Sequence, residues 1–561
     1  MECELHHPLA KKLFELLEIH PDDLDQSIPH DQDLEGQLLR CITDLEIEEL
    51  GFANEDFPNI YRKLPRLFYK HDPTFSKVKG NFNSLEMLKQ CYIDKALQKA
   101  YSHANINTNV KFVIFTWVMD DGWGDLYAQL ETARIVKKSH PLLHIDLVSL
   151  VHKDRKKPLS ISEFQINWLH YSADFLWDEP SIEVLEILSQ ASAIIQIPTS
   201  FPTSTALPEW FVDALSGKCE LIGEYGLIDR AWYHPKKARA MGLHFLEKGI
   251  FIKDMPPSDF RRLENKTILR ILFGKDSPSD EEIADYKSTH RFNLNYTKST
   301  RGYYLYLYTL LQSLIEDEKT IDICFTDMNI LIDVFEKDSF FPQFNIKNVL
   351  IYHRESIAEM TIFNAGKTLR LIHIEDLCHD DFLVLVSSTD DLVGCTGDGS
   401  ISEAISADKV FFYDPPYHKR SFLKDLIALA DRCIPDHPHC IEFLQLCLTP
   451  PDRSLEDVYG DWTTEDYIQP ESMLNLCELG AKLGQLLKHP EFHVGIKKLN
   501  ETIREKYSFN VFLSHFVRRI AVHHLNPEIA EKEETILNDF YKGEKSCKDA
   551  FEEIRELLSG Q

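Results

Sequence analysis

The sequence predicts an α/β protein made of two facing, doubly wound Rossmann-like domains, with helical extensions at both ends. Short runs rich in β-branched and aromatic residues recur through the middle of the chain. These runs are apolar enough to be buried on both faces of a parallel sheet, and amphipathic stretches with helical periodicity separate them. A length of 561 residues suits about three or four domains, and 43% hydrophobic with 27% charged residues is ordinary globular composition.

Residues 1–105 show only helical periodicity. In HHPLAKKLFELLEIH the leucines fall on one face of a helix, and LEGQLLRCITDL repeats the pattern. Proline and aspartate in the joins end one helix and cap the next. We expect a helical N-terminal module here.

The first Rossmann-like domain is predicted over residues 106–285. A buried strand at 110–115, a glycine-bearing loop, an amphipathic helix and a second strand at 143–151 form one βαβ unit. The helix VLEILSQA before strand 193–198 and the helix PEWFVDAL before strand 220–226 continue the alternation.

The second Rossmann-like domain is predicted over residues 286–465, and C-terminal helices over 466–561. The helix YYLYLYTLLQSL follows its first strand, and a short helix is expected at 400–407. Its expected strands are 292–296, 321–325, 348–352, 369–374, 382–387 and 410–414.

Composition excludes several classes of protein. Lys plus Arg total 61 and Asp plus Glu 90, a net charge of −29, so a polyphosphate backbone would be repelled and nucleic-acid binding is not expected. Apolar runs are too short to span a membrane, and the start of the chain lacks the pattern of a signal peptide. Twelve cysteines without a C-x-x-C pair favour reduced thiols in a cytosol over disulfides or a zinc site.

The loop DGWGD follows the strand at 110–115. Its glycines let a ligand approach the backbone closely, and Asp121 and Asp125 bracket the turn. Two nearby carboxylates at the end of a strand can divide the work of accepting and orienting a proton. The competing interpretation is a turn former and a first-turn acid favoured by the helix dipole.

A second loop, TGDGSISEA at 396–404, follows the strand predicted at 382–387. A helix starting at the Gly-Ser step would expose N–H groups and the positive end of its dipole, which suits a diphosphate. Hydroxyls of Ser400 or Ser402 would donate to the anion and Glu403 would accept from ribose hydroxyls. An S-x-x-E capping box between Ser400 and Glu403 is compatible with this. Asp398 fits less well because its carboxylate would repel a diphosphate. The candidate residues of this loop are Thr396, Gly397, Asp398, Gly399, Ser400, Ser402 and Glu403.

Lys298 and Arg301 lie in the loop after the first strand of the second domain. A cation there could neutralise a departing diphosphate without a metal ion. A solvated basic loop explains these residues equally well.

Together these strings resemble the GT-B class of nucleotide-sugar-dependent glycosyltransferases. The string G-x-x-S-x-x-E-A, followed by a strand ending in Tyr413 and Asp414, is similar to their donor-binding segment. D-x-W-G-D resembles the D-x-F-G-D loop of the bacterial protein-arginine rhamnosyltransferases. That likeness implies that Asp121 and Asp125 activate the acceptor and that Gly397, Asp398 and Ser400 hold the donor phosphates. Glu403-Ala404 follows the wider GT-B pattern instead.

The resemblance implies metal-independent transfer of a hexosyl or deoxyhexosyl group from a nucleotide sugar to an acceptor, with a protein among the candidates. No cofactor is implied beyond this donor substrate. The alternatives are an inactive glycosyltransferase-like binding scaffold and a nucleotide-sugar epimerase. The acidic C-terminal tail is similar to the tails of translocated bacterial effectors, so the cytosol could be the cell's own or a host's; a solvated helix face is the plainer interpretation.

Overall fold

The computed structural model divides into two compact units. Unit 1 comprises residues 1–250 and 508–561, and unit 2 comprises residues 251–507. The residues that the structure describes are 93–94, 96–102, 104, 110–117, 124–151, 167–172, 182–199, 218–226, 238–244, 247–326, 340–353, 356–361, 365–374, 377–416, 419–448, 470–542, 544–545 and 547–559. Most of the predicted N-terminal module, the helix PEWFVDAL and Asp121 lie outside them.

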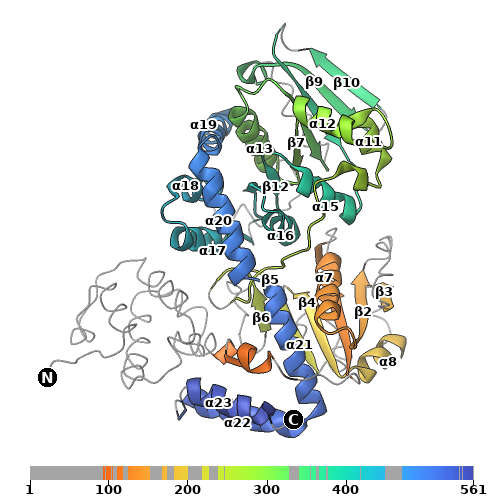
Figure 1. Ribbon diagram of the computed structural model, residues 1–561, viewed down its shortest axis with the longest axis vertical. Coiled ribbons are helices and arrows are strands. Elements are labelled where there is room, and N and C mark those ends of the chain that lie inside the picture. Colours follow the sequence, from red (N-terminus) through yellow and green to blue (C-terminus); the bar gives the residue numbers. More distant parts are fainter. Residues whose placement is uncertain are drawn as a thin grey trace, which may run out of the picture. The chain divides into compact units, whose positions relative to one another are not determined.

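Unit 1 contains a six-stranded parallel sheet with the order β3-β2-β1-β4-β5-β6 (Figure 1). This is the strand order of the Rossmann fold, in which the chain winds away from β1 in one direction and returns to the other side at β4. The strands are β1 (Lys111–Trp117), β2 (His144–Val151), β3 (Asn167–Ser172), β4 (Ala193–Thr199), β5 (Cys219–Tyr225) and β6 (Ala238–Met241).

Helix α7 (Gly124–Ser139) follows β1, and a buried glutamine fixes it to the sheet. The amide of Gln129, which is fully buried, donates to the carbonyl oxygens of Ile114 and Val148 at 2.7 and 2.9 Å, and Ser149 Oγ donates back to Gln129 Oε1. The side-chain amide thus satisfies groups that would otherwise be costly to bury. Helix α8 (Ile182–Gln190) packs its apolar side against the same strands.

Unit 2 contains a seven-stranded sheet with the order β10-β9-β11-β8-β7-β12-β13, parallel except for the β9–β10 hairpin. The winding reverses between β7 and β12, so this sheet is doubly wound as well. The strands are β7 (His290–Asn295), β8 (Thr320–Phe325), β9 (Ile346–His353), β10 (Ser356–Thr361), β11 (Lys367–His373), β12 (Val393–Cys395) and β13 (Phe411–Tyr413). The predicted class of two doubly wound Rossmann-like domains is therefore confirmed.

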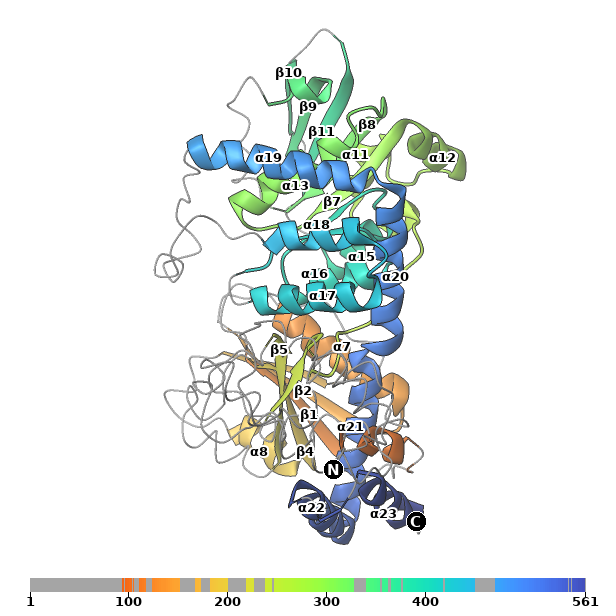
Figure 2. The same ribbon diagram turned by 90° about the vertical axis from the view of Figure 1, so that its left-hand side faces the viewer.

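The helices of unit 2 surround this sheet. Helices α13 and α19 lie side by side in both views (Figure 2), and Gly480 lets them approach, because a Cβ there would lie 2.7 Å from the ring of Tyr308. The helices are α11 (Lys266–Phe273), α12 (Asp280–Thr289), α13 (Thr300–Ser313), α15 (His379–Ser388), α16 (Asp398–Ser406), α17 (Arg420–Cys433), α18 (Pro438–Leu448), α19 (Pro470–Leu487) and α20 (Pro490–Lys506).

The strand predicted at 382–387 is wrong, because these residues form most of helix α15. The stretch FLVLVS shows no amphipathic pattern, because every one of its residues is buried. Hydrophobic periodicity cannot separate a buried strand from a buried helix segment. The strand that leads into the Gly397 loop is β12, with only three residues. Strands β3, β6 and β10 were also not predicted.

The unit boundaries differ from the predicted domain boundaries at 285 and 465. Residues 251–289 belong to unit 2 because α11 and α12 pack there: Tyr286 Oη donates to Asp322 in β8, and Arg370 donates to the Ile271 carbonyl oxygen. The C-terminal helices are divided between the units. Helix α20 belongs to unit 2, whereas α21 (Phe509–Leu525), α22 (Pro527–Lys542) and α23 (Cys547–Ser559) belong to unit 1.

A buried acid ties the helices of unit 1 together. Glu533 of α22 is 1% exposed, accepts from Tyr101 Oη, and pairs with Arg519 and His523 of α21 at 2.6 and 3.2 Å. These partners hold the pKa of Glu533 at about 2 although burial alone would raise it. Within the described part of the chain, no helix has both the length and the apolar character of a membrane span.

Candidate functional site

The predicted donor residues of unit 2 gather at the carboxyl ends of β7 and β12. This is the switch point of the sheet, where the chain leaves the two strands in opposite directions and open α/β sheets usually bind their ligands. Lys298 and Arg301 follow β7, and the loop from Thr396 to Ser400 follows β12. The structure therefore brings together two segments about a hundred residues apart in sequence.

Backbone and hydroxyl contacts fasten these two loops to each other. Tyr296 N donates to the Gly394 carbonyl oxygen at 3.0 Å, and Lys298 N donates to Thr396 Oγ1 at 3.2 Å. Thr396 Oγ1 in turn donates to the carbonyl oxygen of Asp414, at the end of β13. The Thr396 side chain thus connects the ends of strands β7, β12 and β13.

Helix α16 begins at Asp398, two residues before the predicted start, and Gly397 is its N-cap. The expected capping box between Ser400 and Glu403 is therefore wrong. Ser400 Oγ instead accepts from Thr396 N and Gly397 N at 3.1 and 3.2 Å and donates to the Gly397 carbonyl oxygen. The hydroxyl shapes the loop, and with 5% of Ser400 exposed it offers little surface to a ligand. Ser402 is fully buried.

The N-terminal turn of α16 has open space on its glycines. A Cβ placed on Gly397 or on Gly399 would meet no heavy atom within 4 Å, although Gly302, in the first turn of the neighbouring helix α13, is packed tightly against Asp414. The first N–H groups of a helix point outward along its axis and carry the positive end of its dipole. The Cβ positions of Gly397 and Gly399 are therefore open, and this leaves room for a ligand beside the turn.

Asp398, the residue that fits a diphosphate site poorly, has a buried cation beside it. Lys419 Nζ donates to Asp398 Oδ2 at 2.8 Å, and Lys419 is 4% exposed. The Lys419 ammonium compensates the Asp398 carboxylate, so this acid adds no uncompensated negative charge at the positive end of the helix dipole. The sequence prediction missed Lys419, and its position a few residues past strand 410–414 is the signal that could have identified it.

Arg301 lies beside a second buried carboxylate. Asp414 accepts from Ser299 Oγ at 2.5 Å and lies 3.8 Å from the Arg301 guanidinium. Burial raises the pKa of Asp414, and the Ser299 hydroxyl and Arg301 act against that shift. Tyr413, another predicted donor residue, is 1% exposed and packs edge-on against Phe422, so the structure places it in the core.

Glu403, predicted to accept from ribose hydroxyls, is 3% exposed and lies one turn into α16. Its Oε1 accepts from Lys253 Nζ at 2.5 Å and lies 3.4 Å from His379 Nε2. Neither partner was identified from the sequence, because both are distant from the loop that carries Glu403.

The predicted acids of unit 1 lie at the switch point of its own sheet, after β1. Asp125 is in the first turn of α7 and is half-buried, and Asp121 falls outside the described residues. A Cβ on Gly124 would meet no heavy atom within 4 Å. Among the described residues no group of three or more His, Cys, Asp and Glu side chains could hold a metal ion.

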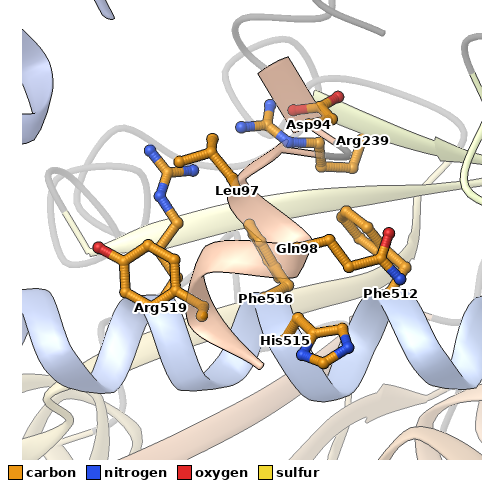
Figure 3. Close-up of a pocket in the computed structure, with 9 residues that line it drawn as sticks. Asp94, Leu97, Gln98, Arg239, Phe512, His515, Phe516 and Arg519 are labelled. Carbon is orange, nitrogen blue, oxygen red and sulfur yellow. The ribbon is translucent and has the colours of Figure 1, made fainter. Parts of the chain in front are cut away.

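Unit 1 contains a pocket that is lined by none of the residues predicted from the sequence (Figure 3). Two of its charged groups are paired: Arg519 with Glu533, and Asp94 with Lys248. Helix residues 94–101, β6 and α21 line it with Asp94, Leu97, Gln98, Tyr101, Arg239, Phe512, His515, Phe516 and Arg519.

Comparison with known proteins finds distant structural likeness only. No family model and no curated protein sequence matches the chain. An α-glucosyltransferase in complex with UDP and a mismatched 13-mer DNA is 12% identical, with a TM-score of 0.34 over 71% of this chain and 95% of that one. WaaG, a glycosyltransferase involved in lipopolysaccharide biosynthesis, is 10% identical, with a TM-score of 0.32 over 73% and 99%. MurG of Acinetobacter baumannii is 10% identical, with a TM-score of 0.29 over 67% and 95%. At this level of similarity, function has to be argued from the residues of the chain itself.

Proposed function

We propose that the protein is a glycosyltransferase whose unit 2 binds a nucleoside diphosphate sugar. The observation that carries the proposal is the switch point of β7 and β12, where an open glycine turn begins α16 and its one carboxylate is paired with a buried lysine. Helix N-termini of this kind bind phosphate groups through backbone N–H donors and the dipole.

In this proposal Gly397 and Gly399 let the diphosphate reach the backbone, with Arg301, Lys298 and Lys419 supplying positive charge nearby. Glu403 accepts from the ribose. Thr396 and Ser400 hold the loop in shape, and Asp398 restrains Lys419. These charges would stabilise the diphosphate as it leaves, so we expect transfer to proceed in the presence of a chelator.

The reaction is a displacement at the anomeric carbon. The acceptor's nucleophilic atom forms a bond to that carbon, the bond from carbon to the diphosphate oxygen breaks, and its electron pair stays on the diphosphate. A carboxylate accepts the acceptor's proton. We assign this role to Asp125 or Asp121, on the loop after β1. A hexose or deoxyhexose as the sugar and a protein as the acceptor remain proposals from sequence resemblance.

A thermal-shift series across UDP, ADP, GDP, CDP and dTDP tests the donor site directly. A ligand that binds only the native state raises the melting temperature as its occupancy increases. At a ligand concentration of 100 Kd, the free energy of unfolding rises by about 2.7 kcal/mol. We expect one nucleotide to stabilise the protein selectively. Equal or absent shifts with all five would contradict a nucleotide-sugar site.

Turnover of the matching nucleotide sugar then tests the reaction itself. Release of the nucleoside diphosphate that depends on an acceptor, and persists in EDTA, is the expected result. Interconversion of sugars without an acceptor would identify an epimerase, and binding without any turnover would identify a scaffold.

A further inference from the structure

The main chain of Asp414 is fixed beside the open turn of α16. Its backbone N donates to the Cys395 carbonyl oxygen at 2.8 Å, and its carbonyl oxygen accepts from Thr396 Oγ1 at 3.2 Å. Cys395 and Thr396 lead directly into Gly397, the N-cap of α16. Asp414 is therefore attached to the strand end from which the open turn starts.

The side chain of Asp414 contacts the start of the neighbouring helix α13. Its Oδ2 accepts from Ser299 Oγ at 2.5 Å, and Ser299 is the N-cap of α13. Gly302 makes room for the carboxylate, because a Cβ at that position would overlap it. These contacts leave the buried carboxylate little freedom to turn.

Arg301 is a cation beside this carboxylate. Its Nη1 lies 3.8 Å from Asp414 Oδ1, and the side chains of Arg301 and Asp414 are 21% and 9% exposed. Burial raises the pKa of Asp414. Hydrogen bonds from Ser299 and the positive charges of Arg301 and Arg420 oppose this rise in pKa and favour the carboxylate. A fixed negative charge therefore lies beside an arginine whose side chain is partly open to solvent.

A guanidinium group can contact a carboxylate and a phosphate at the same time, because it is planar and carries five N–H donors. A long arginine side chain loses rotamer freedom when it binds a ligand, and this loss is smaller when a carboxylate already restrains the side chain. Asp414 is bonded to Thr396, which precedes the open turn. The arginine that Asp414 restrains therefore lies on the same strand ends as the proposed diphosphate site.

We propose that Asp414 is a positioning residue for the diphosphate, because it holds the Arg301 guanidinium beside the open turn of α16. Asp414 acts through Arg301 and does not itself touch the nucleotide. This inference rests on the proposed function and deepens it, since it gives a role to a carboxylate whose charge alone would repel an anion.

The test compares a nucleoside diphosphate with the corresponding monophosphate, using the nucleoside whose diphosphate gives the largest thermal shift. Calorimetric titration of the full chain should show about tenfold or more tighter binding of the diphosphate, the gain expected from a charge-assisted contact. Arg301→Met should lower this ratio. Asp414→Asn keeps the size of the side chain but removes its charge, and should lower the ratio about threefold to tenfold.

A double-mutant cycle separates positioning from a structural role. In the Arg301→Met background, Asp414→Asn should have no further effect on the ratio, because the group that it positions is absent. Lys298→Met removes another cation of the same loop. Its effect should add to that of Asp414→Asn, because the inference couples Asp414 to Arg301 alone.

Asp317→Asn is the matched control. Asp317 also pairs with an arginine of unit 2, Arg291, at 2.8 Å, but it follows the other end of helix α13. Loss of this pair should lower stability without changing the ratio. If Asp414→Asn does not fold, Asp414→Ser takes its place, since a smaller polar side chain fits beside Gly302.

Tighter binding of the diphosphate by Asp414→Asn would overturn the inference, because Asp414 would then act only as a repelling charge. An unchanged ratio, an equal change in Asp317→Asn, or an effect that persists in the Arg301→Met background would overturn it as well. Equal affinity of the wild type for diphosphate and monophosphate would do the same. The absence of any nucleotide binding by the wild type would instead refute the proposed function.

Discussion

The switch points of the two sheets have similar geometry but different charged side chains around them. Each is followed by a helix with an open glycine at its start: Gly124 is the first residue of α7, and Gly397 is the N-cap of α16. Each of these helices carries an acid in its first turn, Asp125 in α7 and Asp398 in α16, and Lys419 pairs with Asp398. The winding of the sheet provides a position for a ligand in both units, and the loop residues alone decide which chemistry that position favours.

The helix that follows the first strand of each sheet is also fixed to that sheet in a similar way but by different groups. In unit 1 the Gln129 amide of α7 donates to strand carbonyl oxygens. In unit 2 the Tyr306 hydroxyl of α13 lies 2.8 Å from the Leu392 carbonyl oxygen and 3.2 Å from that of Leu294. Both units also contain a buried ion pair, Glu533 with Arg519 in unit 1 and Asp322 with Arg370 in unit 2.

The largest effect should come from the acidic switch point. Asp125→Asn removes a proton acceptor but keeps the size of the side chain, so sugar transfer should fall by about 10²–10⁴-fold. The nucleotide-induced thermal shift should stay at the wild-type value, because the donor residues are in unit 2. Asp121→Asn distinguishes the two acids, and the variant with the larger loss identifies the base. Full activity in both variants would contradict a catalytic role for either acid, and with it the functional difference between the two switch points.

The ion pair of unit 2 gives the next effect. Arg370→Met leaves Asp322, which is fully buried, without its cation and should destabilise unit 2 by about 3–5 kcal/mol. Urea unfolding followed by hydrogen exchange of the β8 and β11 amides measures this locally. Arg270→Met, which breaks an exposed pair with Asp276, should cost no more than about 1 kcal/mol. Equal losses in both variants would mean that burial of the pair is unimportant.

Removal of the buried lysine should affect the nucleotide rather than the fold. Lys419→Met leaves Asp398 uncompensated beside the diphosphate, so the affinity for the stabilising nucleotide should fall about 10–100-fold. Lys482→Met, at an exposed pair with Glu442 in the same unit, should leave the affinity unchanged. Calorimetric titration compares them, and unchanged binding by Lys419→Met would show that Asp398 does not face the phosphates.

The smallest effect should come from the glycine turn. Gly399→Ala adds a methyl group where no protein atom lies within 4 Å, so stability should stay the same or rise by up to about 1 kcal/mol through helix propensity. Nucleotide affinity should nevertheless fall severalfold, because the methyl group stands where the ligand approaches. Gly480→Ala, which meets the Tyr308 ring at 2.7 Å, should behave oppositely, with lower stability and unchanged affinity.

The sequence predicted the strands that have strong apolar runs and the loops that follow them. It failed where burial hides periodicity, as in α15, and where a strand is too short to show a pattern, as in β12. In the candidate site it identified the residues adjacent along the chain. Lys253 and His379 could not be predicted as partners of Glu403, because only the fold brings these distant residues next to it, whereas the position of Lys419 shortly after strand 410–414 was a usable signal.

The division of the C-terminal helices has a consequence for synthesis. Unit 1 includes residues 508–561, which are synthesised after the whole of unit 2, and α21 packs on α7 and β4 of a sheet made much earlier. Unit 2 can fold once residue 507 has been synthesised. The sheet of unit 1 keeps part of its apolar surface uncovered until residues 508–561 have been synthesised as well. A nascent chain stopped just before Ser508 should therefore contain a protease-resistant unit 2 and an unfinished unit 1, an inversion of the usual order in which the N-terminal domain folds first.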